Sequence, residues 1–246
     1  MLELFEIKIE DDWIRSKRQK VAEAFNRESN HIKNGNIEII SNQDLRLLFD
    51  LYDEIFLNDW FRNNYEGKMA FSLSKRMTKS AGATICPKNI HKIKPKDLKL
   101  EIRMGINFFF NYDSLQKDKM VSGIRTKNSL EAMQIVFEHE ICHAIEFIYF
   151  NRSSCKGKRF KNLAFNLFGH TESYHRLPSN KQIALEKLGL KIGDAVSFEL
   201  DGKKTAGIIS NINKRATVMV RDKKGDYRDA KGVRYSKYYV PLQLLK

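Results

Sequence analysis

The chain has 246 residues, 42% of them hydrophobic, so it can build one large domain, or a medium domain and a small one, around a sizeable core. We expect no membrane span, because no run approaches roughly 18 apolar residues, and no secretion, because Met1–Glu6 lacks the basic and apolar regions of a signal peptide. The net charge of +14 favours a polyanion as partner, most often nucleic acid, although a solvated lysine-rich surface would give the same charge.

The first region of the chain, residues 1–40, is predicted to be an N-terminal helical extension. A charged stretch over residues 11–29 has helical character, and the Asn- and Gly-containing residues 30–36 have the composition of a linker. We find no residues in this region that suggest chemistry.

The next segment, residues 42–65, is predicted to form one amphipathic helix, because its apolar residues recur at spacings of three and four. Three short segments of alternating character follow and are predicted as strands: 69–73, 82–86 and 99–106. The segment 87–95 between the last two is predicted as a loop.

Two further helices are predicted in the middle of the chain. The first covers residues 129–150, because Asn128-Ser-Leu-Glu131 resembles a capping box in front of an apolar run. A polar break at 152–157 separates it from an amphipathic helix over 158–168. Gly169 is a suitable C-terminal cap for that helix.

The helix over 129–150 carries the motif that most constrains function, His139-Glu140-Ile-Cys-His143. Residues four apart lie on one face of a helix, so both imidazoles can bind one metal ion. The ion lowers the pKa of a bound water, and Glu140 stands where its carboxylate can take the proton of that water as general base. This arrangement is typical of zinc peptidases, which hydrolyse peptides without a covalent intermediate.

The alternative interpretation of this motif is a structural cluster, or a chance meeting of two histidines and a glutamate on an exposed helix. The flanking residues oppose it, because apolar side chains occupy most sides of the helix and such a helix is buried. Buried His and Glu side chains need partners, and a metal ion supplies them. We therefore predict a metal site with His139 and His143 as ligands.

The composition changes after Pro178, and from about Leu190 short β-type runs alternate with turns, which suggests a small barrel. Residues 190–246 hold thirteen Lys and Arg against six Asp and Glu, a net charge of +7 that is half of the total excess. Four tyrosines stand among these basic residues, a mixture used to bind single strands or a nucleic-acid backbone, although two of them would also fit half-buried barrel positions. The basic residues predicted to contact nucleic acid are Lys214, Arg215, Arg228, Lys231, Arg234 and Lys237.

An ordered set of short motifs surrounds the His-Glu-x-x-His sequence. The motifs are Leu-Tyr-Asp-Glu-Ile-Phe at 51–56, Ser-Lys-Arg-Met-Thr-Lys-Ser-Ala-Gly at 74–82, Leu-Glu-Ile-Arg-Met at 100–104 and Gly157-x-x-Phe160. In this order they resemble the SprT-like zinc metalloproteases, the Spartan family, over about residues 42–177. In the tail, Ile192-Gly-Asp-x-Val-x-Phe198 and the stretch 212–218 are similar to the SH3-like barrel of some SprT-like proteins.

This resemblance implies an α+β chain, with a zincin-like helix-plus-sheet metalloprotease domain over residues 41–180 and a basic, all-β SH3-like barrel over 190–246. It also implies Zn²⁺ at the His-Glu-x-x-His motif and proteolysis of proteins that are bound or crosslinked to DNA, with DNA as partner and activator. We therefore expect an intracellular protein of DNA repair that is associated with nucleic acid, in a nucleus or in the nucleoid and cytoplasm.

One position departs from the family pattern, in which the His of a His-Gly-x-x-Phe sequence supplies the third zinc ligand. Lys156 stands there, and a protonated lysine cannot bind zinc, which normally has at least three protein ligands. Cys155 is the preferred substitute, because it needs a shift of one residue and its basic neighbours favour the thiolate. His170 or His175 from beyond the next helix could replace it, or the site is degenerate.

The cysteines limit the kind of metal site further. Three cysteines, Cys86, Cys142 and Cys155, form no CxxC pair, which argues against a disulfide framework and against a zinc site built on paired cysteines. Cys142 lies inside the His-Glu-x-x-His motif at a spacing unsuited to the same ion, so we interpret it as a packing residue.

Three functions are open on these residues. The first is a zinc endopeptidase recruited to DNA, with Glu140 as base and His139, His143 and Cys155 as ligands. The second is a non-catalytic nucleic-acid-binding or scaffolding protein on a degenerate protease fold, which the missing third His motivates. The third is a general peptidase without a DNA role, and the basic tail argues against it.

Overall fold

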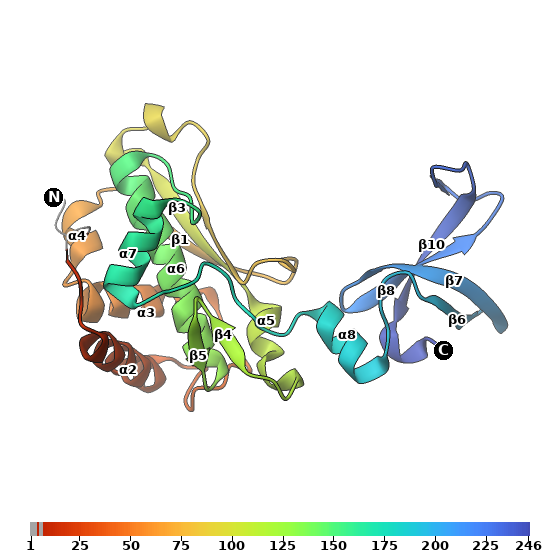
Figure 1. Cartoon of the computed structure of the whole chain (residues 1–246). Helices are drawn as coiled ribbons and strands as arrows, with labels where there is room; N and C mark the ends of the chain where they lie inside the picture. Colours follow the sequence, from red (N-terminus) through yellow and green to blue (C-terminus); the bar gives the residue numbers. More distant parts are fainter. Residues whose placement is uncertain (1–3, 5–6) are drawn as a thin grey trace. The chain divides into compact units, whose positions relative to one another are not determined.

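The computed structural model describes residue 4 and residues 7–246. The prediction that Met1–Glu6 is no signal peptide therefore lies, except for Leu4, outside the described residues. The chain divides into two compact units, one that ends at Leu177 and one over Pro178–Lys246 (Figure 1). Within the described range, no helix combines the length and the apolar character that crossing a membrane requires.

The first unit contains a three-stranded sheet of order β1-β3-β2, whose strands agree with the predicted ones to within one residue. The central strand β3 (Lys99–Gly105) pairs in parallel with β1 (Lys68–Ser74) and antiparallel with β2 (Gly82–Ile85). Successive side chains of a strand point to opposite faces, and one face of β3 is fully buried. The residues on that face are Leu100, Ile102 and Met104. β2 forms one edge of this sheet.

Helix α6 (Ser129–Phe150) runs through the core of the first unit and is buried on most sides, as its apolar flanks predict. At its start, the Asn128 side chain accepts the Glu131 N–H at 2.9 Å, but the Glu131 carboxylate accepts the N–H of Lys127, at 2.8 Å. The capping box predicted at this position is therefore only half formed. At its end, Asn151 has a φ of 54°, a left-handed conformation that stops the helix.

Helices α2 (Asp11–Glu28) and α7 (Lys158–Phe168) contact α6, and α3 (Asn42–Leu51) contacts α2 and β1. The buried carboxylate of Glu138, at the centre of α6, links α6 to the neighbouring segments by hydrogen bonds. It accepts hydrogen bonds from Arg18 of α2 at 2.7 Å and from the Tyr52 hydroxyl after α3 at 2.7 Å.

The prediction of a single helix over 42–65 is wrong. The segment consists of α3, a π-helical turn over Tyr52–Phe56, and α4 (Trp60–Asn64). Asn58 and Asp59 break it, because both have left-handed backbone conformations, with φ of 54° and 57°. The Asp53 carboxylate then accepts two backbone N–H groups at the start of α4, at 2.7 and 3.0 Å, which allows a new helix to begin.

Several short elements of the first unit carry no prediction: α5 (Ile106–Phe110), β4 (Lys119–Val121), β5 (Ile124–Thr126), and a 3₁₀ turn over Tyr112–Ser114. The segment predicted as a loop, 87–95, contains a 3₁₀ turn over Ile90–Lys92, and a second one, Pro95–Asp97, begins at its last residue. β4 and β5 form a hairpin, and the chain after α7 returns along it. The Ser122 N–H donates to the Tyr174 carbonyl at 2.9 Å, and the Arg176 N–H donates to the Met120 carbonyl at 2.6 Å. These bonds fix the position of His175, which lies between the two bonded residues of the returning chain.

The second unit contains α8 (Asn180–Leu188) and a five-stranded antiparallel sheet of order β6-β7-β8-β10-β9. The strands are β6 (Ala195–Leu200), β7 (Lys203–Ile212), β8 (Arg215–Arg221), β9 (Tyr227–Arg228) and β10 (Arg234–Pro241), and a 3₁₀ turn follows over Leu242–Leu244. Ser197 of β6 and Lys246 exchange two backbone hydrogen bonds, at 2.9 and 3.0 Å. The predicted α+β class, with an all-β sheet at the end of the chain, is confirmed. Closure of that sheet into an SH3-like barrel stays a prediction.

Candidate metal centre

His139 and His143 project from successive turns of α6, and their Nε2 atoms lie 3.2 Å apart. Burial lowers the pKa of His139 to about 3 and that of His143 to about 4, so both imidazoles are neutral at pH 7 and can offer lone pairs. Ligands of a tetrahedral zinc ion with bonds of about 2.0–2.3 Å lie roughly 3.3–3.8 Å from one another. The two nitrogens are therefore close to the separation that a shared zinc ion requires.

A hydrogen-bond chain behind His143 fixes the state of its ring. The Ser153 hydroxyl donates to the Glu146 carboxylate at 2.6 Å, and Arg159 donates to the other Glu146 oxygen at 2.7 Å. Because the Ser153 proton is used in this way, the Ser153 oxygen accepts the Nδ1–H of His143, at 2.5 Å. The lone pair of the ring is thereby placed on Nε2, the atom that faces His139.

Cys155, in the loop between α6 and α7, completes a group of three possible metal ligands. Its Sγ and ring nitrogens of His139 and His143 all lie within 4.8 Å of one another. Two neutral imidazoles and a thiolate form a donor set that zinc accepts. Lys156, at the position of the expected third His, is exposed. The residues present therefore fit a zinc ion.

The two other histidines considered as third ligands lie elsewhere. The His170 ring is buried and donates from Nε2 to the Glu138 carboxylate at 2.9 Å, so this nitrogen belongs to the cluster in the core. The His175 ring packs edge-on against Phe108, with 4.8 Å between the ring centroids. Among the described residues, the group of possible ligands contains neither His170 nor His175.

Glu140 lies next to the possible ligands, on the side of α6 that faces β2. The Thr84 hydroxyl donates to its carboxylate at 2.8 Å, yet burial outweighs this contact and raises the pKa of Glu140 to about 7. The approach of β2 is close: a Cβ atom at Gly82 would lie 2.6 Å from Glu140 Oε1 and 2.8 Å from Val136 Cγ1. Only a glycine fits there without displacing the carboxylate.

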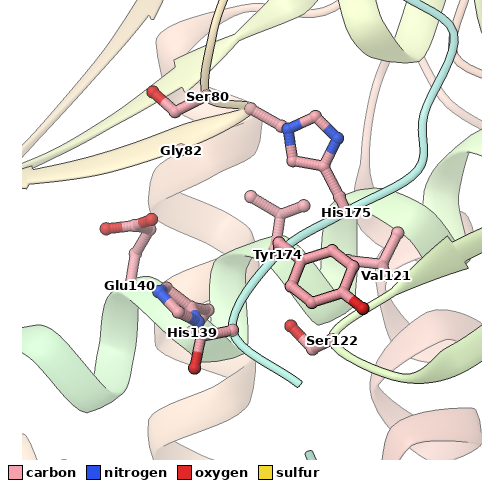
Figure 2. A pocket seen from close by; sticks show the side chains of 11 residues that line it. Ser80, Gly82, Val121, Ser122, His139, Glu140, Tyr174 and His175 are labelled. Carbon is pink, nitrogen blue, oxygen red and sulfur yellow. The ribbon is translucent and has the colours of Figure 1, made fainter. Parts of the chain in front are cut away.

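A cleft opens above these residues. Figure 2 shows His139 and Glu140 on one side of it, Gly82 beside Glu140, and His175 across from them. The cleft is lined by Ser80, Ala81, Gly82, Val121, Ser122, Val136, His139, Glu140, Ser173, Tyr174 and His175. Its walls come from β2, α6, the β4–β5 hairpin and the chain after α7, so a ligand in it would touch the catalytic candidate Glu140.

The structure does not gather the six basic residues of the tail on one face. The alternation of β8 and β10 places Arg215 and Lys237 on the face opposite the core of the second unit, where Lys237 Nζ lies 3.6 Å from the centroid of the Tyr227 ring. Arg228 and Arg234 are cross-strand partners at the start of β10, and the same alternation places both on the face of the sheet that carries the core. The remaining two, Lys214 and Lys231, are exposed in turns.

Sequence patterns identified His139, Glu140, His143 and Cys155 as candidates, but missed the residues that hold them. Thr84 and Gly82 lie on strand β2, Glu146 lies on α6 itself, and Ser153 lies in the loop after α6. The spacing of Glu146, three residues after His143, is the one available signal, because it repeats the helical face of the motif.

One comparison with known proteins gives a match. The sequence model of the SprT-like family matches residues 48–178, which is more than half of the 246-residue chain. No curated protein and no solved structure matches.

Proposed function

The chain belongs to the SprT-like family, which indicates a metalloprotease-type function, and on this premise we propose that it is a zinc-dependent endopeptidase that acts on proteins bound or crosslinked to DNA. One observation carries the proposal: His139, His143 and Cys155 converge beside Glu140 at the edge of a cleft. Two neutral imidazoles, a thiol and a buried carboxylate in this arrangement are the parts of a hydrolytic zinc site.

His139, His143 and Cys155 would hold the zinc ion. When bound, the ion lowers the pKa of a water and polarises the carbonyl of the scissile amide. Glu140 takes the proton of the attacking water and later gives it to the leaving nitrogen. Thr84 orients the Glu140 carboxylate throughout, and Ser153 keeps the lone pair of His143 on the ligand nitrogen.

The substrate would be an extended peptide segment. Because β2 is an edge strand and its first residue lines the cleft, a peptide can add to the sheet there and place an amide next to Glu140. Main-chain hydrogen bonds of this kind bind any sequence, so we expect weak side-chain preference and a requirement for locally unfolded protein.

DNA is proposed as the partner of the second unit, on a surface that we call the outer sheet face. This surface consists of Ile208, Arg215, Thr217, Met219, Arg221, Tyr235, Lys237 and Tyr239, which the strand register places opposite the core. Tyr239 is 65% exposed and Ile208 48% exposed, and the basic side chains lie beside them. Exposed rings next to cations suit unpaired bases and their phosphates, so single-stranded DNA is the expected form.

A non-catalytic nucleic-acid-binding protein on a degenerate protease fold is a second candidate. The exposed Lys156 in place of the third His favours it. Both candidates expect binding of DNA that weakens as the salt concentration rises, so DNA binding does not separate them.

Zinc content and cleavage, measured on the same preparations, separate these functions. We expect about one zinc ion per wild-type chain, loss of zinc in Cys155→Ala, and normal zinc without cleavage in Glu140→Gln. Cys86→Ala, a half-buried cysteine outside the ligand group, is the matched control and retains zinc. The substrate is a disordered protein crosslinked to a single-stranded oligonucleotide. A stably folded wild type without zinc would reject the peptidase and leave the non-catalytic candidate.

A further inference from the structure

His175 lines the same cleft as His139 and Glu140, but the function proposed above gives it no role. The segment that carries it is held on both sides of the histidine, by the backbone bonds of Tyr174 and Arg176 to the β4–β5 hairpin. The edge-on contact with Phe108 fixes the plane of its ring. His175 is therefore a rigidly placed group inside the reaction cleft.

The hydrogen bonds of His175 determine where its proton lies. The Leu177 N–H donates to Nδ1 at 3.3 Å, so Nδ1 carries the lone pair and the ring proton is on Nε2. Burial lowers the pKa of His175, so the ring is neutral at pH 7. In the part of the chain that the structure describes, the hydrogen-bonding partner of this ring is at Nδ1, which leaves the Nε2–H group for a ligand in the cleft.

We propose that His175 is a catalytic residue of the endopeptidase, whose Nε2–H donates a hydrogen bond to the carbonyl oxygen of the scissile amide. This role rests on the proposed function. The donor is the Nε2–H of the neutral His175 ring, and the general base Glu140 lies on the opposite wall of the cleft. A preorganised donor of this kind stabilises the charge that appears on the oxygen during the reaction.

The step in which His175 acts is the addition of water to the amide carbon. The water oxygen forms a bond to that carbon, its proton passes to Glu140, and the π electrons of the carbonyl move to the oxygen that His175 contacts. The electron pair on that oxygen then re-forms the carbonyl while the carbon–nitrogen bond breaks, the bond's electron pair stays on the nitrogen, and the nitrogen takes the proton from Glu140. His175 loses and gains no proton in the cycle, so its contribution is hydrogen bonding alone.

The other polar side chains on that wall are already engaged. The Tyr174 hydroxyl donates to Glu172 at 2.9 Å and accepts from Arg176 at 3.2 Å, and its ring is 56% exposed. The Ser173 hydroxyl donates to the Cys155 carbonyl at 3.2 Å. Of the cleft-lining residues 173–175 of the chain after α7, His175 is therefore the donor that reaches the cleft without breaking a contact that the structure contains.

Kinetics of three variants with the DNA-crosslinked disordered protein test this role. For His175→Leu we expect kcat to fall about 10²- to 10³-fold with little change in KM, because the contact strengthens only as charge develops. His175→Gln keeps an N–H donor at similar reach and should recover part of that rate. His91→Leu, an exposed histidine on a 3₁₀ turn, is the control and should match the wild type.

Two readouts besides activity make the outcomes distinct. Zinc content should be normal in all three variants, and a loss of zinc in His175→Leu would make His175 a ligand and overturn the role. Long-range ¹H–¹⁵N NMR spectra of the wild type should show the His175 proton on Nε2, and a proton on Nδ1 would overturn it as well. An unchanged kcat in His175→Leu would reject this role alone, whereas a wild type that binds zinc and cleaves nothing would reject the peptidase itself.

Discussion

Ser153 is the residue through which the loop after α6 controls the metal-binding atom of His143. Its hydroxyl donates to the Glu146 carboxylate and therefore accepts the Nδ1–H of His143. This pair of bonds selects the tautomer of His143 with the lone pair on Nε2. Partners of this kind affect metal affinity without touching the metal, because they orient the ring and raise its basicity. Such a contact is invisible in the sequence, where Ser153 is one polar residue in a polar loop.

Replacement of Ser153 by Ala is expected to weaken zinc binding about 10- to 100-fold, because the ring then loses its acceptor at Nδ1. Competition with a chelating dye measures the affinity. Ser154→Ala is the matched control, since the neighbouring residue reaches Glu146 through its backbone N–H and keeps that contact. Equal zinc affinity in the two variants would show that the hydrogen-bond chain has no effect on the metal site.

Gly82 sets the distance between strand β2 and Glu140. A methyl group there would overlap Glu140 Oε1, so Gly82→Ala is expected to displace the carboxylate. A misplacement of about 1 Å typically lowers the rate of catalysis about 10²-fold. Zinc content should stay normal, because His139, His143 and Cys155 are untouched. Full cleavage activity in this variant would mean that the Glu140 carboxylate tolerates a second position.

The sequence predicts the site only in part. His139, Glu140 and His143 follow from a spacing of four residues on one helix, which needs no knowledge of the rest of the fold. The position of Cys155 depends on the path of a loop. The roles of Thr84 and His175 depend on which strand and which returning segment face α6, and no pattern local to either residue contains that information.

At the scale of the element, Asp44 connects the start of α3 to the end of α2. Its carboxylate accepts hydrogen bonds from the hydroxyls of Ser29 and Ser41, from the Ser41 N–H and from the His31 ring, at 2.7–2.8 Å. Burial raises the pKa of Asp44, but these bonds outweigh it and lower the pKa below its ordinary value. The charged carboxylate thus stabilises the folded state at neutral pH.

The sign of the pH dependence follows from this shift. Because the folded-state pKa is below the unfolded value of about 3.9, the stabilisation is fully present above that pH and is lost as the pH falls through the folded-state pKa. Asp44→Asn is expected to be about 1–3 kcal/mol less stable than the wild type at pH 7, since an amide cannot accept all four bonds. Urea unfolding at several pH values measures this difference.

The difference in unfolding free energy between wild type and Asp44→Asn should shrink below about pH 4. A matched control is Asp50→Asn, on the exposed side of the same helix, whose carboxylate lies 4.0 Å from Arg46. If the difference in unfolding free energy between wild type and Asp44→Asn stays constant down to pH 2.5, the carboxylate of Asp44 does not provide the stabilisation.

The elements of this fold differ in how far the sequence determines them. Strands β1, β2 and β3 follow from the alternating character of their residues, and α6 follows from a capping pattern in front of a long apolar run. The prediction of one helix over 42–65 is wrong because the spacing of the apolar residues continues across Asn58 and Asp59, although both residues adopt left-handed conformations that interrupt a helix. The β4–β5 hairpin has three residues in each strand, too few for a period, and its pairing with the chain after α7 is a contact between distant segments.

At the scale of the whole molecule, the chain pairs an α+β unit that holds the candidate metal centre with a separate unit that has its own core and +7 of the net charge over residues 190–246. The second core contains Val196, Phe198, Ile209 and Val218, with Tyr238 packed against it. Each unit therefore has the packing to fold around its own apolar residues, and substitutions on the surface of one should leave the chemistry of the other intact.

Tyr239→Ser tests the outer sheet face as the nucleic-acid surface. Stacking of one base on an aromatic ring contributes about 1–3 kcal/mol, so the affinity for single-stranded DNA should fall about 5- to 150-fold. Fluorescence anisotropy with a labelled oligonucleotide measures it, at one fixed salt concentration. Leu185→Ser, another exposed apolar residue of the second unit but on α8, is the control. Equal affinity in the two variants would place the contact surface elsewhere.

The use of Cys155 as third ligand, next to the position where the family pattern has an imidazole, gives the proposed site a chemistry that an all-histidine site lacks. Peroxide converts a thiolate to a sulfenic acid, which no longer binds zinc as a thiolate does, and thiols reverse the change. Cys155 is half-buried, so small oxidants can reach it. A peptidase with this sulfur as a zinc ligand would lose its metal under oxidative stress and regain it under reducing conditions. Its activity would therefore depend on the redox state of its surroundings.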